Sequence, residues 1–73
     1  MNDTAVKGHW KQIRIKAKEW WEKLTDDDLD MIDGKRDQLI GKLQERYGYS
    51  KEKAAREVNA CLSEIERALS KTH

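Results

Sequence analysis

The spacing of the apolar residues constrains this chain more strongly than any other feature of its sequence. Within separate stretches between residues 6 and 69, apolar side chains recur every three or four positions, which is the period of one face of an α-helix. The chain contains no proline, and lysine, glutamate, alanine, leucine and glutamine are common in it, a composition that favours helices. The pattern therefore predicts an all-α protein.

The length of the chain limits the size of its core. With 73 residues, 37% of them hydrophobic, we expect a single domain over residues 1–73 with a small core. The three tryptophans and two tyrosines, in the absence of phenylalanine, should supply much of the buried area.

The first predicted helix covers residues 6–24, and Asn2, Asp3 or Thr4 is expected to cap its start. We interpret its apolar stripe as core, because so small a chain has few other large side chains to bury. A helix lying on a membrane surface is the alternative, because one flank is basic. The stripe consists of Val6, Trp10, Ile13, Ala17, Trp20, Trp21 and Leu24, with Ile15 expected to be exposed on the opposite face. The basic flank consists of Lys7, Lys11, Arg14 and Lys18.

The segment "LTDDDLDMID", residues 24–33, carries five aspartates between two basic regions. Thr25 and Asp28 have the spacing of a capping box, and Leu24 and Leu29 that of a hydrophobic staple. Carboxylates in a first turn also oppose the positive end of the helix dipole. The segment therefore predicts a short helix over about residues 26–32, with Leu29 and Ile32 turned inward.

A metal site is not expected in this chain. A calcium-binding EF-hand loop starting at Asp26 would need glycine where Met31 stands and glutamate where Asp37 stands. The two histidines, His9 and His73, lie at opposite ends of the chain, and Cys61 is the only cysteine, which excludes a cysteine-based zinc site and an internal disulfide. Cys61 is interpreted as a small core residue, with an intermolecular disulfide as the alternative.

Two further helices are predicted after the aspartates. Asp33 is expected to cap the third helix, whose stripe is Leu39, Ile40, Leu43 and Tyr47. Gly48 should end that helix in the left-handed conformation, and Ser50 should cap the fourth helix, which is predicted to extend to about residue 71. The buried face of the fourth helix is predicted to be Ala54, Val58, Cys61, Leu62, Ile65, Ala68 and Leu69.

Several classes of function are disfavoured by the sequence. There is no nucleophile with a partnered base, no metal-ligand set and no glycine-rich phosphate loop, so we expect neither catalysis nor a cofactor. The longest apolar run is three residues, which excludes a membrane span and makes a cytoplasmic location the default. A net charge of +1 argues against a dedicated nucleic-acid site. A monomer is expected.

The turn within "RYGYSKEKAAREV", residues 46–58, suggests an alternative function. It is similar to a helix-hairpin-helix motif, in which backbone amides hold a phosphate, although Ser50 replaces the usual second glycine. The same turn is also similar to the Met-Gly-Phe loop of ubiquitin-associated domains. The candidate polyanion contacts are Gly48, Ser50, Lys51 and Lys53 in the turn, together with Lys7, Lys11, Arg14 and Lys18.

Three stretches resemble the CsbD-like family of small bacterial stress-response proteins. They are "KGHWKQ" at 7–12, "KLTDDDLDMIDGKRDQLIGKLQERYGYSKEKA" at 23–54 and "REV" at 56–58, so the resemblance is strongest over residues 1–58. This chain departs from the family at Ile15, where glycine is usual, at the doubled Trp20 and Trp21, and in the tail after residue 58.

The resemblance implies a compact bundle of four short helices, arranged as two helical hairpins packed crosswise. It also implies a non-catalytic role in stress, either as a soluble protectant or through weak interactions. It supplies no catalytic residue and no partner, so partners remain unknown. The residues expected to have a structural role are Trp10, Ile13, Trp20, Trp21, Leu24, Thr25, Asp28, Leu29, Leu39, Leu43, Tyr47, Gly48, Val58, Leu62 and Ile65.

Overall fold

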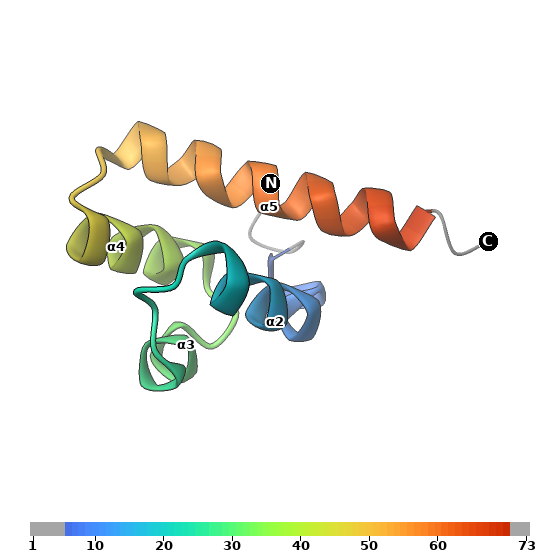
Figure 1. Cartoon of the computed structure of the whole chain (residues 1–73), viewed down its shortest axis with the longest axis horizontal. Coiled ribbons are helices and arrows are strands. Elements are labelled where there is room, and N and C mark those ends of the chain that lie inside the picture. The colour runs from blue at the N-terminus through green and yellow to red at the C-terminus, as the bar shows by residue number, and fades with distance from the viewer. Residues whose placement is uncertain (1–5, 71–73) are drawn as a thin grey trace.

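The computed structural model of the protein describes residues 6–70, and this part of the chain is helical without any strand. Its helices are α2 (Trp10–Trp20), α3 (Asp26–Ile32), α4 (Arg36–Tyr47) and α5 (Lys51–Ser70). The long helix α5 runs along one side, α2 and α4 pack beneath it, and α3 lies against α4 on the side away from α5 (Figure 1). The radius of gyration is 11.5 Å, close to the roughly 11 Å typical of a compact chain of this length.

The first helix is interrupted, which the sequence pattern did not predict. Residues 6–8 are helical, but a turn at His9 separates them from α2, so residues 6–70 contain five helical segments rather than four. Gly8 precedes the turn, and glycine is a poor helix former. The candidate caps Asn2, Asp3 and Thr4 lie outside the described residues. The crosswise packing of two hairpins stays a prediction.

One hydrophobic core joins all of the helices, and most of the predicted apolar stripes contribute to it. Three residues of these stripes, Trp10, Trp20 and Tyr47, are only half-buried and pack against its edge. The indole N–H groups of Trp20 and Trp21 both donate to Glu57 Oε1, at 3.3 and 3.4 Å. The core consists of Val6, Ile13, Ala17, Trp21, Leu24, Leu29, Ile32, Leu39, Ile40, Leu43, Ala54, Val58, Cys61, Leu62 and Ile65.

The end of α5 departs from the prediction that its whole apolar stripe is buried. Ala68 and Leu69 are exposed, Leu69 to 39%. The reason is length, because α5 has 20 residues and is therefore about 30 Å long, whereas α2 and α4 have 11 and 12. The last turns of α5 thus run past the helices that cover its first turns (Figure 1).

The predicted start of α3 is confirmed in detail. The Asp28 N–H donates to Thr25 Oγ1 at 3.1 Å, and the Thr25 N–H donates to Asp28 Oδ2 at 3.2 Å. These two hydrogen bonds form the capping box. At the other end of the α3–α4 pair, Gly48 ends α4 with φ 70°, and the Lys53 N–H donates to Ser50 Oγ at 3.1 Å at the start of α5.

The prediction that Asp33 caps α4 is wrong. Asp33 instead ends α3 in the left-handed conformation, with φ 47°, and its N–H donates to Leu29 O at 3.1 Å. The N-cap of α4 is Lys35, which makes no side-chain capping hydrogen bond. The difference arises because Gly34 is also left-handed, with φ 78°, so the chain turns fully through Asp33 and Gly34 before α4 begins.

Candidate functional site

The carboxylate of Asp28 is the one buried acidic group between residues 6 and 70. Arg46 donates two hydrogen bonds to it, from Nε to Oδ2 at 3.0 Å and from Nη2 to Oδ1 at 2.9 Å. Lys42 Nζ lies 3.5 Å from Oδ1. The Arg46 hydrogen bonds are the largest cause that holds the pKa of Asp28 well below its usual range, although burial opposes them. Asp28 is therefore ionised and fully engaged, which fits a structural role for this carboxylate.

Two other aspartates of α3 pair with the basic flank of α2. Asp30 Oδ1 lies 2.6 Å from Arg14 Nη1, and Asp26 Oδ1 lies 2.8 Å from Lys18 Nζ. The hydrogen bond from Lys18 also lowers the pKa of Asp26. Over the described residues, no group of three or more His, Cys, Asp or Glu side chains is arranged to hold a metal ion. The aspartate run thus compensates basic charge within the protein.

This pairing divides the predicted basic flank into two parts. Arg14 and Lys18 are neutralised by α3, whereas Lys7 and Lys11 are exposed and have no ion pair within residues 6–70. The four residues therefore do not form one uniform cationic strip.

Side chains in the turn between α4 and α5 contact other groups of the protein. The rings of Tyr47 and Tyr49 stack with centroids 5.1 Å apart. Lys53 Nζ lies 4.9 Å from the Tyr49 centroid, and Lys23 Nζ lies 5.1 Å from the Tyr47 centroid, distances at which cation–π attraction operates. The Tyr47 hydroxyl also accepts from the Lys23 N–H at 3.0 Å.

Two of the four turn residues named as candidate polyanion contacts already make contacts within the protein. Lys53 lies over an aromatic ring, and Ser50 Oγ accepts from a backbone N–H. Gly48 serves as the left-handed end of α4, and Lys51 is exposed at the start of α5. The absence of a dedicated nucleic-acid site stays a prediction, as do the polyanion contacts themselves.

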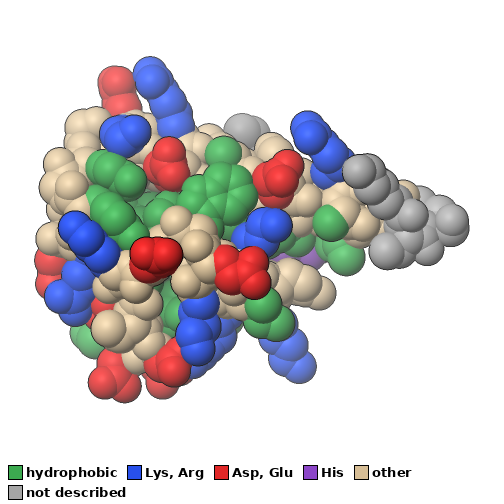
Figure 2. Space-filling view, viewed as in Figure 1, with side chains coloured by type: hydrophobic (Ala, Val, Ile, Leu, Met, Phe, Trp, Pro, Cys, Tyr) green, Lys and Arg blue, Asp and Glu red, His purple; other side chains and the backbone are tan. Residues whose placement is uncertain are grey.

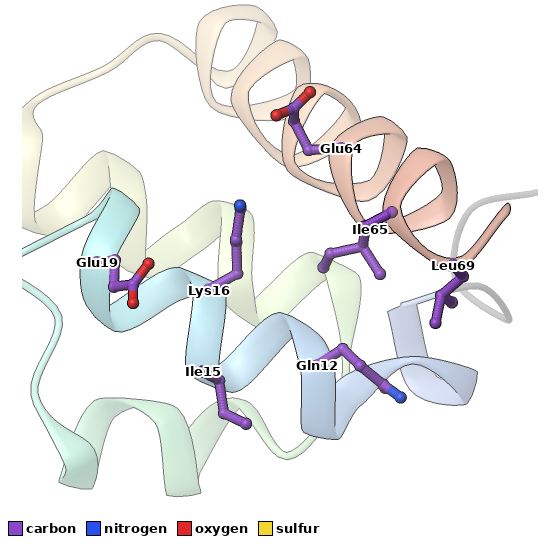
Figure 3. Close-up of a pocket in the computed structure, with 8 residues that line it drawn as sticks. Gln12, Ile15, Lys16, Glu19, Glu64, Ile65 and Leu69 are labelled. Atoms are coloured by element: carbon purple, nitrogen blue, oxygen red, sulfur yellow. The ribbon is translucent and has the colours of Figure 1, made fainter. Parts of the chain in front are cut away.

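A groove of ≈ 250 Å³ lies between α2 and the overhanging end of α5. Ile65 and Leu69 extend from α5 towards α2, and Lys16 extends from α2 towards α5 (Figure 3). Ile15, predicted to be exposed, is 67% exposed and lines the same groove. Sequence reasoning missed this groove, because it placed Leu69 in the core. The remaining lining residues are Gln12, Glu19, Glu64 and Ala68.

The surface around the helices mixes both signs of charge. Lys and Arg side chains alternate with Asp and Glu side chains over the face drawn in Figure 2, and hydrophobic side chains are exposed between them. Cys61 does not belong to this surface, because it is buried among the core residues as predicted. Its burial raises the pKa of the thiol to about 11, which keeps it protonated and unreactive near neutral pH.

These features define a small all-helical protein with a charge-compensated surface. Within residues 6–70, no helix combines the length and the apolar character needed to cross a membrane. The CsbD-like family pattern matches residues 4–56. Because this match covers more than half of the chain, the protein belongs to the CsbD-like family.

Similar proteins occur in several bacteria. A UPF0337 protein of Pectobacterium atrosepticum is 64% identical over 58 residues, covering 80% of this chain and 84% of its own length. The UPF0337 protein YjbJ of Escherichia coli strain K12 is 60% identical over 58 residues, with 80% of this chain and 84% of its own length covered. A UPF0337 protein of Pseudomonas aeruginosa is 59% identical over the same length, with 80% and 89% covered.

Proposed function

We propose that this protein is a non-catalytic stress-response protein that acts through weak contacts with apolar segments of partly unfolded proteins. The groove between α2 and α5 is the observation that carries the proposal. Membership of the CsbD-like family, and the stress-response role that the resemblance implies, support its biological context.

The groove has the properties of a weak and unselective contact surface. Its apolar residues Ile15, Ile65 and Leu69 are framed by Lys16, Glu19 and Glu64, so its rim carries both signs of charge and a net charge of only −1. Its volume of ≈ 250 Å³ is slightly below the roughly 300–1,000 Å³ of pockets that enclose small ligands. It is therefore better suited to one or two side chains of a larger partner.

The expected affinity follows from the same dimensions. Burying one large apolar side chain contributes about 1.5–3 kcal/mol, whereas association costs roughly 4–15 kcal/mol in lost freedom. One or two buried side chains leave little net binding energy, so contacts should be brief. Such a protein would protect its partners in bulk rather than by forming stable complexes.

We further propose that the chain is one domain of two crossed hairpins, that it is a monomer and that it works in the cytoplasm. The single core spanning all helices supports the one-domain interpretation. Light scattering on the purified protein tests the monomer, since a mass of twice 8.6 kDa would contradict it.

An aggregation assay tests the proposed function. A heat-sensitive enzyme such as citrate synthase is warmed with an excess of this protein, and light scattering follows the aggregation of the enzyme. We expect the protein to slow aggregation, and the double variant Ile15→Ser with Leu69→Ser to lose most of that effect. Met31→Ser is the matched control, because Met31 is 66% exposed, lies on α3 and does not line the groove. Equal protection by all three proteins would contradict the role of the groove.

A further inference from the structure

A second recess, of ≈ 300 Å³, brings together three cationic side chains from two parts of the chain. Lys7 comes from the first helical segment, and Lys35 and Arg36 come from the start of α4. Asp37 and Gln38 complete the lining. The side chains of the recess therefore carry a net charge of +2, and none of them lines the α2–α5 groove.

Gly34 precedes the recess residues Lys35 and Arg36 and packs against the first helical segment. Gly34 is buried and left-handed, with φ 78°. A Cβ atom on this residue would lie 3.5 Å from Lys7 Cα and 3.4 Å from Trp10 Cγ. These are ordinary van der Waals distances, so a side chain at residue 34 is disfavoured by the positive φ rather than by a lack of space. The packing of this loop therefore brings Lys35 and Arg36 into the recess that Lys7 also lines.

The three cations make no salt bridge within the described part of the chain, although Asp37 lines the same recess. Lys7, Lys35 and Arg36 form no ion pair there, in contrast to Arg14, Lys18, Lys42, Arg46 and Arg67. The Arg36 Nε atom is moreover buried and lacks a hydrogen-bond partner in residues 6–70. Buried donors are nearly always satisfied in folded proteins, so this unsatisfied donor in a cationic recess is consistent with a bound group that supplies an acceptor.

We propose that this recess binds the phosphate group of a small molecule, either inorganic phosphate or a phosphate monoester. The guanidinium of Arg36 offers a planar fork of donors that matches two phosphate oxygens, and the lysines add two point charges. A dianion neutralises the net charge of +2. The first turn of α4 has no side-chain cap, so its positive dipole adds to the potential at this end of the helix.

An NMR titration of the intact protein with sodium phosphate tests the site. It is run at about pH 7.5, where a phosphate group is mostly dianionic, with sodium chloride added to hold the ionic strength constant. We expect saturable shifts of the Arg36 Nε–H signal and of the amides of residues 35–38, with a Kd in the range of about 1 mM. The Arg46 Nε–H signal is the internal control, because that group already donates to Asp28 at 3.0 Å.

Variants of the lining residues separate specific binding from general attraction. Lys35→Gln and Arg36→Gln should each weaken phosphate binding by about threefold or more, and Asp37→Asn should strengthen it. Lys11→Gln and Lys51→Gln are the controls, because both lysines are exposed and lie outside the recess. The dispersion of the amide spectrum checks that each variant is folded, and Lys35 is exposed, so its replacement should leave the fold intact.

Three outcomes would overturn the proposal. One is a linear, unsaturated response of the Arg36 signal, and another is an equal loss of affinity in Lys11→Gln and Lys35→Gln. The third comes from a parallel titration with a short single-stranded oligonucleotide. Binding of the oligonucleotide more than about tenfold tighter than phosphate, and dependent on Lys35, would assign the recess to nucleic-acid backbones instead.

Discussion

Arg46 and Arg36 stand near opposite ends of α4, and their guanidinium groups have opposite surroundings. Arg46 makes two hydrogen bonds to the buried carboxylate of Asp28, at 3.0 and 2.9 Å. Arg36 has a buried Nε atom without a partner in residues 6–70, and Lys35 and Lys7 line the same recess. At one end of α4 the arginine is paired with a buried carboxylate. At the other end three cationic side chains line one recess.

The difference teaches that the packing of loops, rather than composition, decides which charges are satisfied. The turn at Asp33 and Gly34 folds α3 back along α4, and this brings Asp28 to Arg46. The same turn packs Gly34 against Lys7 and so places cations together at the opposite end. A paired charge such as that of Asp28 stabilises the fold, whereas a cationic side chain without a salt bridge is available to bind a ligand.

The largest expected effect on stability comes from breaking the hydrogen-bonded pair of Asp28 and Arg46. Asp28→Asn removes a charged acceptor from Arg46 and weakens the capping box, so it should lower the free energy of unfolding by about 2–3 kcal/mol. Urea denaturation followed by tryptophan fluorescence measures this change. Asp27→Asn is the matched control on the same first turn, because Asp27 is exposed, and it should cost less than about 1 kcal/mol. Equal effects of the two variants would show that Asp28 acts only through the helix dipole.

Acid should remove the same stabilisation. The pKa of Asp28 is lowered in the folded protein, so its contribution is fully present above the unfolded-state value of about 3.9. It is then lost as the pH falls through the lower pKa of the folded state. The difference in stability between the wild type and Asp28→Asn should therefore be constant from about pH 6 to 7 and shrink below about pH 4. Urea denaturation at a series of pH values measures this difference, and a gap that persists unchanged to about pH 2 would contradict the assignment.

Replacing each arginine by methionine compares the two ends of α4 directly. Methionine keeps much of the aliphatic packing and removes the donors. Arg46→Met leaves the buried Asp28 without its main partner and should clearly lower the melting temperature. Arg36→Met removes an unsatisfied donor and should raise the free energy of unfolding, by up to about 1 kcal/mol in phosphate-free buffer. Thermal denaturation followed by circular dichroism checks both variants, and destabilisation by Arg36→Met would show that its guanidinium has a stabilising role.

The smallest effect is expected where the paired charges face solvent. Asp30→Asn breaks the contact with Arg14, whose side chain is 34% exposed, while that of Asp30 is 64% exposed. Exposed pairs contribute little, so the cost should be less than about 0.5 kcal/mol and should vanish at high salt. Chemical denaturation at two salt concentrations measures it. A cost as large as that of Asp28→Asn would mean that burial is not what distinguishes the two carboxylates.

Much of the fold was predictable because its signals are local. The helical period of the apolar residues predicted the all-α class and most of the core, and the capping box spans only Thr25 to Asp28. The glycine at the end of α4 and the serine before α5 are likewise recognisable within a few residues. The Asp33 prediction failed within this local range, because Asp-Gly can end one helix as readily as it begins the next.

The candidate sites were not predictable in the same way. The sequence identified Lys7 as cationic and Asp28 as a cap, but it did not identify Arg36 or Arg46 as their neighbours. It also assigned Leu69 to the core, because the period of the apolar residues does not reveal that α5 extends beyond the helices that cover it. The nucleic-acid alternative was drawn from residues of the 48–53 turn, and two of these, Ser50 and Lys53, make contacts within the turn.

The sequence by itself determined the all-α class, most of the buried faces and how α3 begins, because each of these depends on residues within one or two helical turns of each other. Only the tertiary structure decided which charges meet. Asp28 and Arg46 are separated by 18 positions, and Lys7 lies still farther from Arg36 along the chain. Electrostatic energy depends on the distance between charges in space and on their burial, and the loop packed around Gly34 sets both.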